Sequence, residues 1–158
     1  MKPEAKKYLS VIGAGICDTE TAAAAEEIGR LIARAGAVLV CGGLGGVMEA
    51  ACRGAREEGG ATIGILPGLD REDANPYIDH AICTGVGHAR NLAVAASGDA
   101  VIAVGGEFGT LSEIGLARKA GRRVVLLGSW EIRNGGNPPD GVLTATSPVQ
   151  ALLLALED

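Results

Sequence analysis

The sequence predicts an α/β fold: a single-domain, Rossmann-like, doubly wound parallel sheet with helices on both faces. Apolar runs alternate with segments of helical periodicity along all 158 residues. Strands that are apolar throughout and alternate with helices indicate a parallel sheet covered on both sides. Right-handed crossovers then place helices on either face. The length favours one domain over residues 1–158.

The first half of the chain predicts three strands and two helices. Apolar runs predict strands at residues 8–12, 37–41 and 62–66. The first helix can be capped by Asp18 or Thr19, ends at Gly36, and has apolar residues at helical spacing: Ile28, Leu31, Ile32 and Ala35. The second helix stops at Gly59-Gly60 and turns a small apolar face inward: Val47, Met48, Ala51, Cys52 and Ala55.

The second half predicts four strands and three helices. Strands are expected at residues 77–83, 100–104, 123–127 and 142–145. Helices are expected at residues 85–97, from the turn at 105–109 to Ala120, and from Pro148 to Leu156 with Ser147 as N-cap. Residues 69–76 are polar and irregular, which predicts a loop at the rim of a site. The loop at 129–141, with Trp130, is expected to cover either the site or an interface.

Composition and charge argue against several classes of function and location. The net charge of −5 argues against a nucleic-acid partner or an anionic membrane surface. No segment is long and apolar enough to cross a bilayer, and no N-terminal run suits a signal peptide. The four cysteines are far apart, without a CxxC pair. We expect a cytoplasmic protein with reduced thiols, no metal and no cofactor of its own.

Three Gly-rich turns follow predicted strands at residues 13–15, 42–46 and 105–109. In this fold the carboxyl ends of the strands carry the ligand site, and all three turns fall on that edge. Glycines let the backbone approach a ligand, and a following helix start offers unpaired N–H groups to an anion. The predicted ligand-binding residues are Gly13, Gly15, Gly42, Gly43, Gly46, Gly105, Gly106, Glu107, Gly109 and Thr110. The expected ligand is a small phosphorylated molecule or another small anion.

Common nucleotide motifs fit poorly. The turn Gly13-Ala14-Gly15 has Asp18 where a dinucleotide fingerprint needs its third glycine. A Walker A sequence is absent. No lysine lies in a Gly-rich segment, which argues against a pyridoxal-dependent decarboxylase.

Three segments resemble motifs of the Lonely Guy family, whose members were long mislabelled as lysine decarboxylases, and of its wider superfamily. Residues 41–49 resemble GGGxxGLMG, residues 87–91 resemble MHxRK, and residues 105–113 resemble PGGxGTxxE. The resemblance covers residues 8–127. It implies hydrolysis of the N-glycosidic bond of nucleoside 5′-monophosphates, with Arg90 and Glu113 as the catalytic pair. It also implies a homodimer or homotetramer.

Four departures from the family pattern point to a divergent branch. Gly105 replaces a proline, Glu107 and Glu49 replace glycines, and Asn91 replaces a lysine. Glu107 places a carboxylate in the phosphate turn, where it opposes an anion. A related branch contains carrier proteins for the molybdenum cofactor, which resemble these enzymes in fold but do not hydrolyse. The resemblance therefore implies a phosphorylated ligand that is either nucleotide-like, as for the enzymes, or pterin-like, as for the carriers. A carrier or a nucleotide-sensing module is therefore an alternative to the phosphoribohydrolase.

The same residues have structural interpretations. Thr110 and Glu113 fit a capping box, in which Glu113 bonds back to the helix start. Arg90 could be a solvated surface arginine, and His88 a rim residue without a catalytic role. The sequence leaves these interpretations open.

Overall fold

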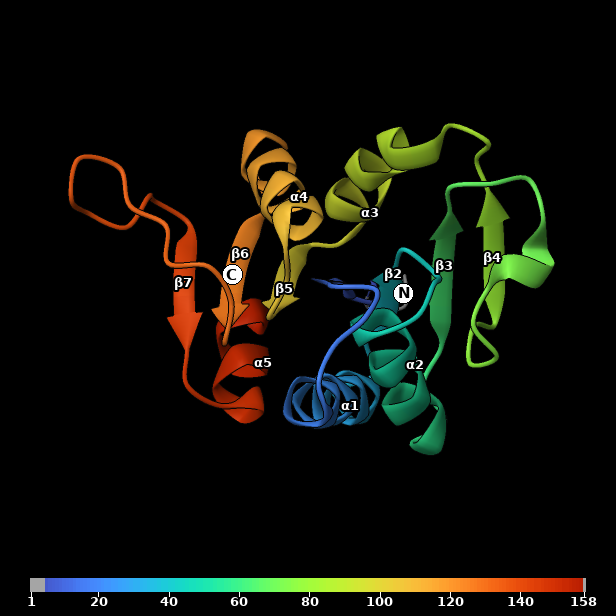
Figure 1. The fold of residues 1–158 in the computed structure, drawn as a ribbon. Helices are drawn as coiled ribbons and strands as arrows, with labels where there is room; N and C mark the ends of the chain where they lie inside the picture. Colours follow the sequence, from blue (N-terminus) through green and yellow to red (C-terminus); the bar gives the residue numbers. More distant parts are fainter. Residues whose placement is uncertain (1–4, 158) are drawn as a thin grey trace.

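The computed structural model describes residues 5–157, which fold around one parallel sheet (Figure 1). The strand order is β4-β3-β2-β1-β5-β6-β7, and every neighbouring pair is parallel. This arrangement confirms the predicted Rossmann-like doubly wound fold. The strands are Tyr8–Gly13 (β1), Val38–Cys41 (β2), Thr62–Leu66 (β3), His80–Cys83 (β4), Ala100–Val104 (β5), Arg123–Leu127 (β6) and Val142–Ala145 (β7).

Helices cover both faces of the sheet (Figure 1). One face carries α1 (Thr19–Arg34), α2 (Val47–Glu57) and α5 (Pro148–Leu156), and the other carries α3 (Asn91–Ser97) and α4 (Phe108–Lys119). Alternate residues of the central strands point to opposite sides, so β1 sends Leu9 and Val11 to one apolar core and Ile12 to the other. The central strands are apolar throughout because both of their faces are buried.

The topology brings three Gly-rich turns together. β1 lies between β2 and β5 at the centre of the sheet. The strands that follow β1 in sequence are added on one side up to β4, and the strands from β5 onward are added on the other side. The turns after these three strands therefore meet at the switch point of the sheet, where α/β proteins bind ligands. Two predicted helix caps are also present. Asp18 Oδ1 accepts from Thr21 N at 2.7 Å, and Ser147 Oγ accepts from Gln150 N at 3.2 Å.

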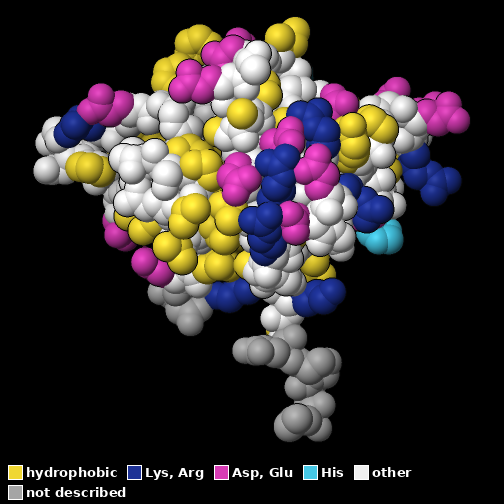
Figure 2. All heavy atoms as spheres, turned by 90° about the horizontal axis from the view of Figure 1, so that it is seen from below, with side chains coloured by type: hydrophobic (Ala, Val, Ile, Leu, Met, Phe, Trp, Pro, Cys, Tyr) yellow, Lys and Arg dark blue, Asp and Glu magenta, His cyan; other side chains and the backbone are white. Residues whose placement is uncertain are grey.

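The α1 and α2 helices pack closely and are joined by ion pairs at the surface. Figure 2 shows positive and negative side chains intermixed over these two helices, beside hydrophobic side chains over α5. Glu26 of α1 accepts from Arg53 of α2 at 2.6 Å, and Arg30 donates to Glu57 at 2.8 Å. Such exposed pairs orient the helices but add little stability individually. None of the helices within residues 5–157 is long and apolar enough to span a membrane.

The structure corrects two predicted boundaries. The strand predicted at 77–83 forms only at His80–Cys83, because Thr62 Oγ1 donates to the Tyr77 carbonyl at 2.6 Å and Asp79 caps Thr62 N at 2.9 Å. These side-chain bonds replace the ladder. The helix predicted at 85–97 is instead a 3₁₀ turn, Gly87–Arg90, followed by the short helix α3.

The capping-box interpretation is wrong. The α4 helix begins at Phe108 with Glu107 as N-cap, and that cap has no side-chain hydrogen bond. Thr110 is therefore already inside the first turn, and Glu113 lies one turn further along. At that position Glu113 is too far from the helix start to bond back to it.

Candidate functional site

The three turns enclose a cavity of about 530 Å³ at the carboxyl edge of the sheet. Its walls come from the turn after β1, the start of α2, the 3₁₀ turn before α3, and the first two turns of α4. The residues that line it are Gly13, Ala14, Gly15, Ile16, Leu44, Gly45, Met48, His88, Arg90, Asn91, Glu107, Gly109, Thr110 and Glu113. Residues far apart in the sequence thus form one concave site.

Glycines allow the turns after β1 and β2 to touch. A Cβ on Gly13 would lie 2.6 Å from the Val47 side chain at the start of α2, and one on Gly46 would lie 2.2 Å from the Ala14 carbonyl oxygen. Gly46 also has a φ of 63°, a conformation that favours glycine. The Ala14 carbonyl then accepts a hydrogen bond from Val47 N at 3.0 Å. The start of α2 is held against the β1 turn without intervening side chains.

The α4 start has the geometry of an anion site. Gly105 and Gly106 both have positive φ, and a Cβ on Gly106 would lie 2.5 Å from the Thr110 side chain. Gly109 has open space where a Cβ would be, and it lines the cavity. Thr110 is buried and also lines it. The first turn of α4 therefore presents N–H groups and a hydroxyl to the cavity, with the positive end of the helix dipole.

Arg90 is buried and ties three segments of the site together. Its Nε donates to the Ile65 carbonyl at 2.9 Å, its Nη2 donates to the Gly42 carbonyl at 3.3 Å, and its Nη1 donates to Asn91 Oδ1. Burial lowers the pKa of Arg90, while nearby Glu113 acts in the opposite sense. The solvated-surface interpretation of Arg90 is wrong. Its guanidinium braces the turn after β2, and Arg90 also lines the cavity.

Glu113 projects from the second turn of α4 into the same cavity and is 8% exposed. Burial raises its pKa to about 7, and the charge of Arg90 offsets only part of that rise. No ion pair joins it to Arg90 within the described part of the chain. The site therefore holds a carboxyl group that exchanges its proton near neutral pH. Such a group can accept or donate a hydrogen bond to a ligand.

The departures from the family pattern have separate consequences. Glu107 is exposed and lines the cavity at the N-cap of α4. Its carboxylate therefore lies at the rim, where water screens its repulsion of an anion. Glu49 lies in the first turn of α2, where a negative charge suits the helix dipole. Asn91 orients Arg90 where the family has a lysine.

The loop at 69–76 supports the site from outside. Asn75, in the loop at 69–76, donates from Nδ2 to the Leu44 carbonyl at 2.9 Å and from its backbone N to the Gly43 carbonyl at 2.9 Å. That loop includes a 3₁₀ turn, Arg71–Asp73. Behind the turn, the free thiols of Cys41 and Cys52 lie 3.5 Å apart in the core. The loop thus fixes the Gly-rich turn after β2 rather than contributing side chains to the cavity.

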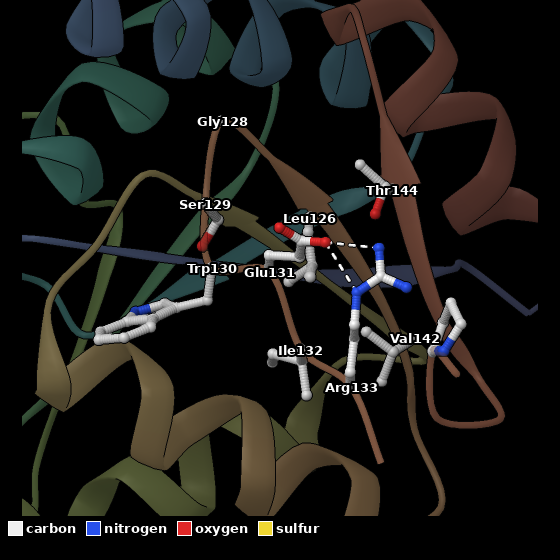
Figure 3. A pocket seen from close by; sticks show the side chains of 10 residues that line it. Leu126, Gly128, Ser129, Trp130, Glu131, Ile132, Arg133, Val142 and Thr144 are labelled. Atoms are coloured by element: carbon white, nitrogen blue, oxygen red, sulfur yellow. Dashed lines mark hydrogen bonds and ion pairs between the residues drawn. The ribbon is translucent and has the colours of Figure 1, made fainter. Parts of the chain in front are cut away.

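The loop at 129–141 supports the α4 start and has its own cavity of about 420 Å³ (Figure 3). Ser129 Oγ donates to the Gly105 carbonyl at 2.5 Å, and Trp130 Nε1 donates to the Glu107 carbonyl at 3.2 Å. Figure 3 shows Glu131 paired with Arg133 on the other side of this cavity. Within residues 5–157, no group of three His, Cys, Asp or Glu side chains is arranged to hold a metal ion.

The predicted site residues divide into two groups. The cavity is lined by Gly13, Gly15, Arg90, Glu107, Gly109, Thr110 and Glu113. The remaining predicted residues shape the turns behind the cavity: Gly42, Gly43, Gly46, Gly105 and Gly106. Of these, Gly105 lines a neighbouring cavity beside the start of α1. Sequence reasoning missed the apolar wall of Ile16 and Leu44. The sequence did carry a signal for Ile16: it directly follows a Gly-rich turn and fits no strand or helix periodicity, which indicates an apolar side chain placed at the site rather than in the core.

Comparisons with known proteins give consistent matches. The model of the SLOG cluster4 family matches residues 6–152. An uncharacterized protein of Archaeoglobus fulgidus is 50% identical over 119 residues, which is 75% of this chain and 78% of that protein. The molybdenum cofactor binding protein of Rippkaea orientalis is 38% identical over 96% of both chains, with a TM-score of 0.89. The molybdenum cofactor carrier protein of Chlamydomonas reinhardtii is 36% identical over 94% of this chain and 95% of its own, with a TM-score of 0.83.

Proposed function

Because the chain belongs to the SLOG cluster4 family, we propose that it binds a phosphorylated pterin of the molybdenum-cofactor type and carries it without hydrolysis. The observation that carries this proposal is the cavity at the switch point, with an anion-binding helix start on one wall. Similarity to a cofactor-binding and a cofactor-carrier protein over almost the whole chain supports the ligand class.

The phosphate is assigned to the first turn of α4. Gly109 leaves the N–H groups of that turn open to the cavity, and the Thr110 hydroxyl lies beside them. Backbone N–H groups at a helix start bind phosphate through hydrogen bonds and the helix dipole. The rest of the ligand then extends across the cavity toward Arg90 and Glu113.

Two features favour carriage over hydrolysis. Three of the five N–H groups of Arg90 are engaged by Ile65, Gly42 and Asn91, so this side chain acts mainly as a brace. Burial also keeps a large fraction of Glu113 protonated at neutral pH, which weakens it as a stabiliser of an oxocarbenium ion. A site that holds its ligand through fixed N–H groups, and whose buried carboxyl group is not fully ionised, suits binding and carriage of the ligand rather than its hydrolysis.

Hydrolysis of nucleoside 5′-monophosphates is the second candidate. It is favoured by one observation: Arg90 and Glu113, the predicted catalytic pair, line the same cavity as the phosphate turn. A carboxyl group with a pKa of about 7 can also act as a general acid toward a departing base. In this reaction water adds to the ribose carbon as the bond to the base breaks, and the base leaves with a proton.

One preparation tests both candidates. The protein is purified from a host that makes the molybdenum cofactor, and its bound pterin is released, oxidised and measured by fluorescence. The same protein is then incubated with a panel of nucleoside 5′-monophosphates, and the release of free base is measured. We expect bound pterin and no free base. Gly109→Asp should reduce retention about tenfold, since a carboxylate beside the phosphate repels it while the helix start tolerates an acidic residue.

Gly109→Ala is the matched control, because the space beside Gly109 is open and the change adds volume without charge. It should retain the pterin. Release of free base that Glu113→Gln abolishes would establish the hydrolase instead. Equal retention by Gly109→Asp and Gly109→Ala would exclude the α4 start as the phosphate site.

A further inference from the structure

The interior of the switch-point cavity holds two polar side chains that are nearly buried and have bonding capacity to spare. Glu113 is 8% exposed and Asn91 is 7% exposed, and both line the cavity. Among residues 5–157, no group donates a hydrogen bond to the Glu113 carboxyl group, and Asn91 Nδ2 donates to none. Every fully buried side-chain oxygen or nitrogen in that range does have a partner. The unpartnered atoms of Glu113 and Asn91 are therefore open to the cavity, where a ligand can bond to them.

Arg90 fixes the orientation of the Asn91 amide. Its Nη1 donates to Asn91 Oδ1. A guanidinium only donates, so the amide oxygen must face Arg90 and the amide NH₂ group must point away from it. Arg90 is itself held by the carbonyl groups of Ile65 and Gly42. Asn91 therefore offers N–H donors from a fixed position.

Asn91 and Glu113 come from neighbouring helices. Asn91 begins α3 and Glu113 lies in the second turn of α4, and Figure 1 shows these helices side by side over one face of the sheet. The charge of Arg90 acts on Glu113, whose pKa of about 7 makes its carboxylate form available at neutral pH. Of the two carboxyl groups that line the cavity, those of Glu107 and Glu113, only the second is buried. The interior thus combines N–H donors with one carboxyl group that accepts hydrogen bonds through both oxygens when ionised.

We propose that Asn91 and Glu113 recognise the edge of the ligand's ring and select a 2-amino-4-oxopyrimidine, the ring portion that pterins and guanine share. An amino group, a ring N–H and a carbonyl are adjacent on this edge. The Glu113 carboxylate accepts from the amino group and the ring N–H, and Asn91 Nδ2 donates to the carbonyl. The inference rests on the proposed phosphate site at the α4 start, which holds the other end of the ligand.

The selectivity follows from the cost of unpaired groups in a buried site. Two hydrogen bonds to one carboxylate are charge-assisted and stronger than neutral ones. Hypoxanthine lacks the amino group and leaves one carboxylate oxygen without its donor. Adenine has an amino group in place of the carbonyl and a bare nitrogen in place of the ring N–H, so it matches neither Glu113 nor Asn91. An unpaired buried polar group costs more than a hydrogen bond gains.

Four probes separate the ring edge from the phosphate. Guanosine 5′-monophosphate carries the complete edge, inosine 5′-monophosphate lacks the amino group, and adenosine 5′-monophosphate has the wrong edge. Ribose 5-phosphate has no ring and measures the phosphate site alone. Calorimetry should show that the guanosine nucleotide binds about tenfold more tightly than the inosine nucleotide and about 100-fold more tightly than the adenosine nucleotide.

Two variants change only the groups that face the ring. Glu113→Gln exchanges one acceptor for a donor, so it should weaken the guanosine nucleotide about tenfold and leave ribose 5-phosphate unchanged. Asn91→Asp keeps an oxygen toward Arg90 and replaces only the NH₂ group, so it should lower the preference for the guanosine over the adenosine nucleotide. Leu153→Ala, at an exposed apolar position on α5, is the control variant and should change neither.

The outcomes distinguish the ring edge from the phosphate site. If the unmodified protein binds ribose 5-phosphate but binds the guanosine and adenosine nucleotides equally, recognition of the ring edge is overturned and the phosphate site stands. The same holds if the ratio of these two affinities is unchanged in both Glu113→Gln and Asn91→Asp. Failure of all four probes to bind the unmodified protein would overturn the phosphate site and the recognition of the ring edge together.

Discussion

At the scale of single residues, Glu113 shows how burial changes the role of a side chain. A carboxyl group at this depth pays a large desolvation cost when it ionises, and the nearby charge of Arg90 recovers only part of it. The carboxyl group therefore binds a proton more tightly in the folded protein than in the unfolded chain. Glu107 is six residues earlier, at the exposed rim, and remains in contact with water.

This difference predicts a pH dependence of stability. The pKa of Glu113 rises from its ordinary value of 4.5 to about 7 on folding. Its contribution to stability is thus fully present below pH 4.5 and is lost as the pH rises through 7. Glu113→Gln removes the loss, so its free energy of unfolding relative to the unmodified protein should rise by about 2–3 kcal/mol between pH 5 and pH 8.

Denaturant unfolding of both proteins at several pH values measures this difference. Groups other than Glu113 titrate equally in the two proteins and cancel in the comparison. A difference that stays constant from pH 5 to pH 8 would show that Glu113 ionises as freely in the folded protein as in the unfolded chain.

At the scale of secondary-structure elements, close helix packing supports the site. The α1 and α2 helices cross at Gly29 and Gly54, where an added Cβ would lie 1.9 Å from a backbone carbonyl oxygen of the other helix. Only glycine permits that approach. The start of α2 forms one wall of the cavity, and its position depends on this contact with α1.

Two glycine substitutions test the packing against helix propensity. Gly54→Ala should destabilise the protein by about 1–3 kcal/mol, because the two helices must move apart. Gly115→Ala, in α4, has open space around the new Cβ and should stabilise by about 0.5–1 kcal/mol through helix propensity. Thermal unfolding measures both changes. Stabilisation by both substitutions would mean that the α1–α2 contact yields easily.

At the scale of the whole molecule, the two faces of the sheet are covered unequally. The face under α3 and α4 leaves a shallow cavity of about 270 Å³ beside β3 and β4, lined by apolar residues that include Ile63 and Ile82. Ile82 is 50% exposed. On the opposite face, Val149 and Leu153 of α5 are more than half exposed. Each of these apolar areas could be covered by a second copy of the chain.

The homodimer or homotetramer stays a prediction, and light scattering at micromolar concentration measures it. We expect two or four times the mass of the chain, because burying apolar area drives association. Ile82→Lys and Leu153→Lys locate the interface, since a buried unpaired charge should lower the mass for the variant that lies within it. A monomer at that concentration would contradict the prediction.

The sequence by itself determined the fold and its chain-order features. Strand positions such as 62–66, 100–104 and 123–127 are confirmed because continuous apolar runs report burial on both faces of a sheet. The resemblance to the superfamily of the Lonely Guy proteins, in a branch near the molybdenum cofactor carriers, is confirmed by the family match and the solved structures. The three Gly-rich turns predicted the correct edge of the sheet for the cavity, because topology alone brings them together.

Only the tertiary structure decided the roles of individual side chains at that edge. The sequence left Glu113 open as a helix cap, Arg90 as a surface residue and Trp130 as a cover. The structure buries the first two and places Trp130 against Phe108. Local patterns record backbone preference and the average environment of a segment. The pKa of a carboxyl group, or the exposure of one aromatic ring, depends on neighbours contributed by distant segments, and these are set only when the chain has folded.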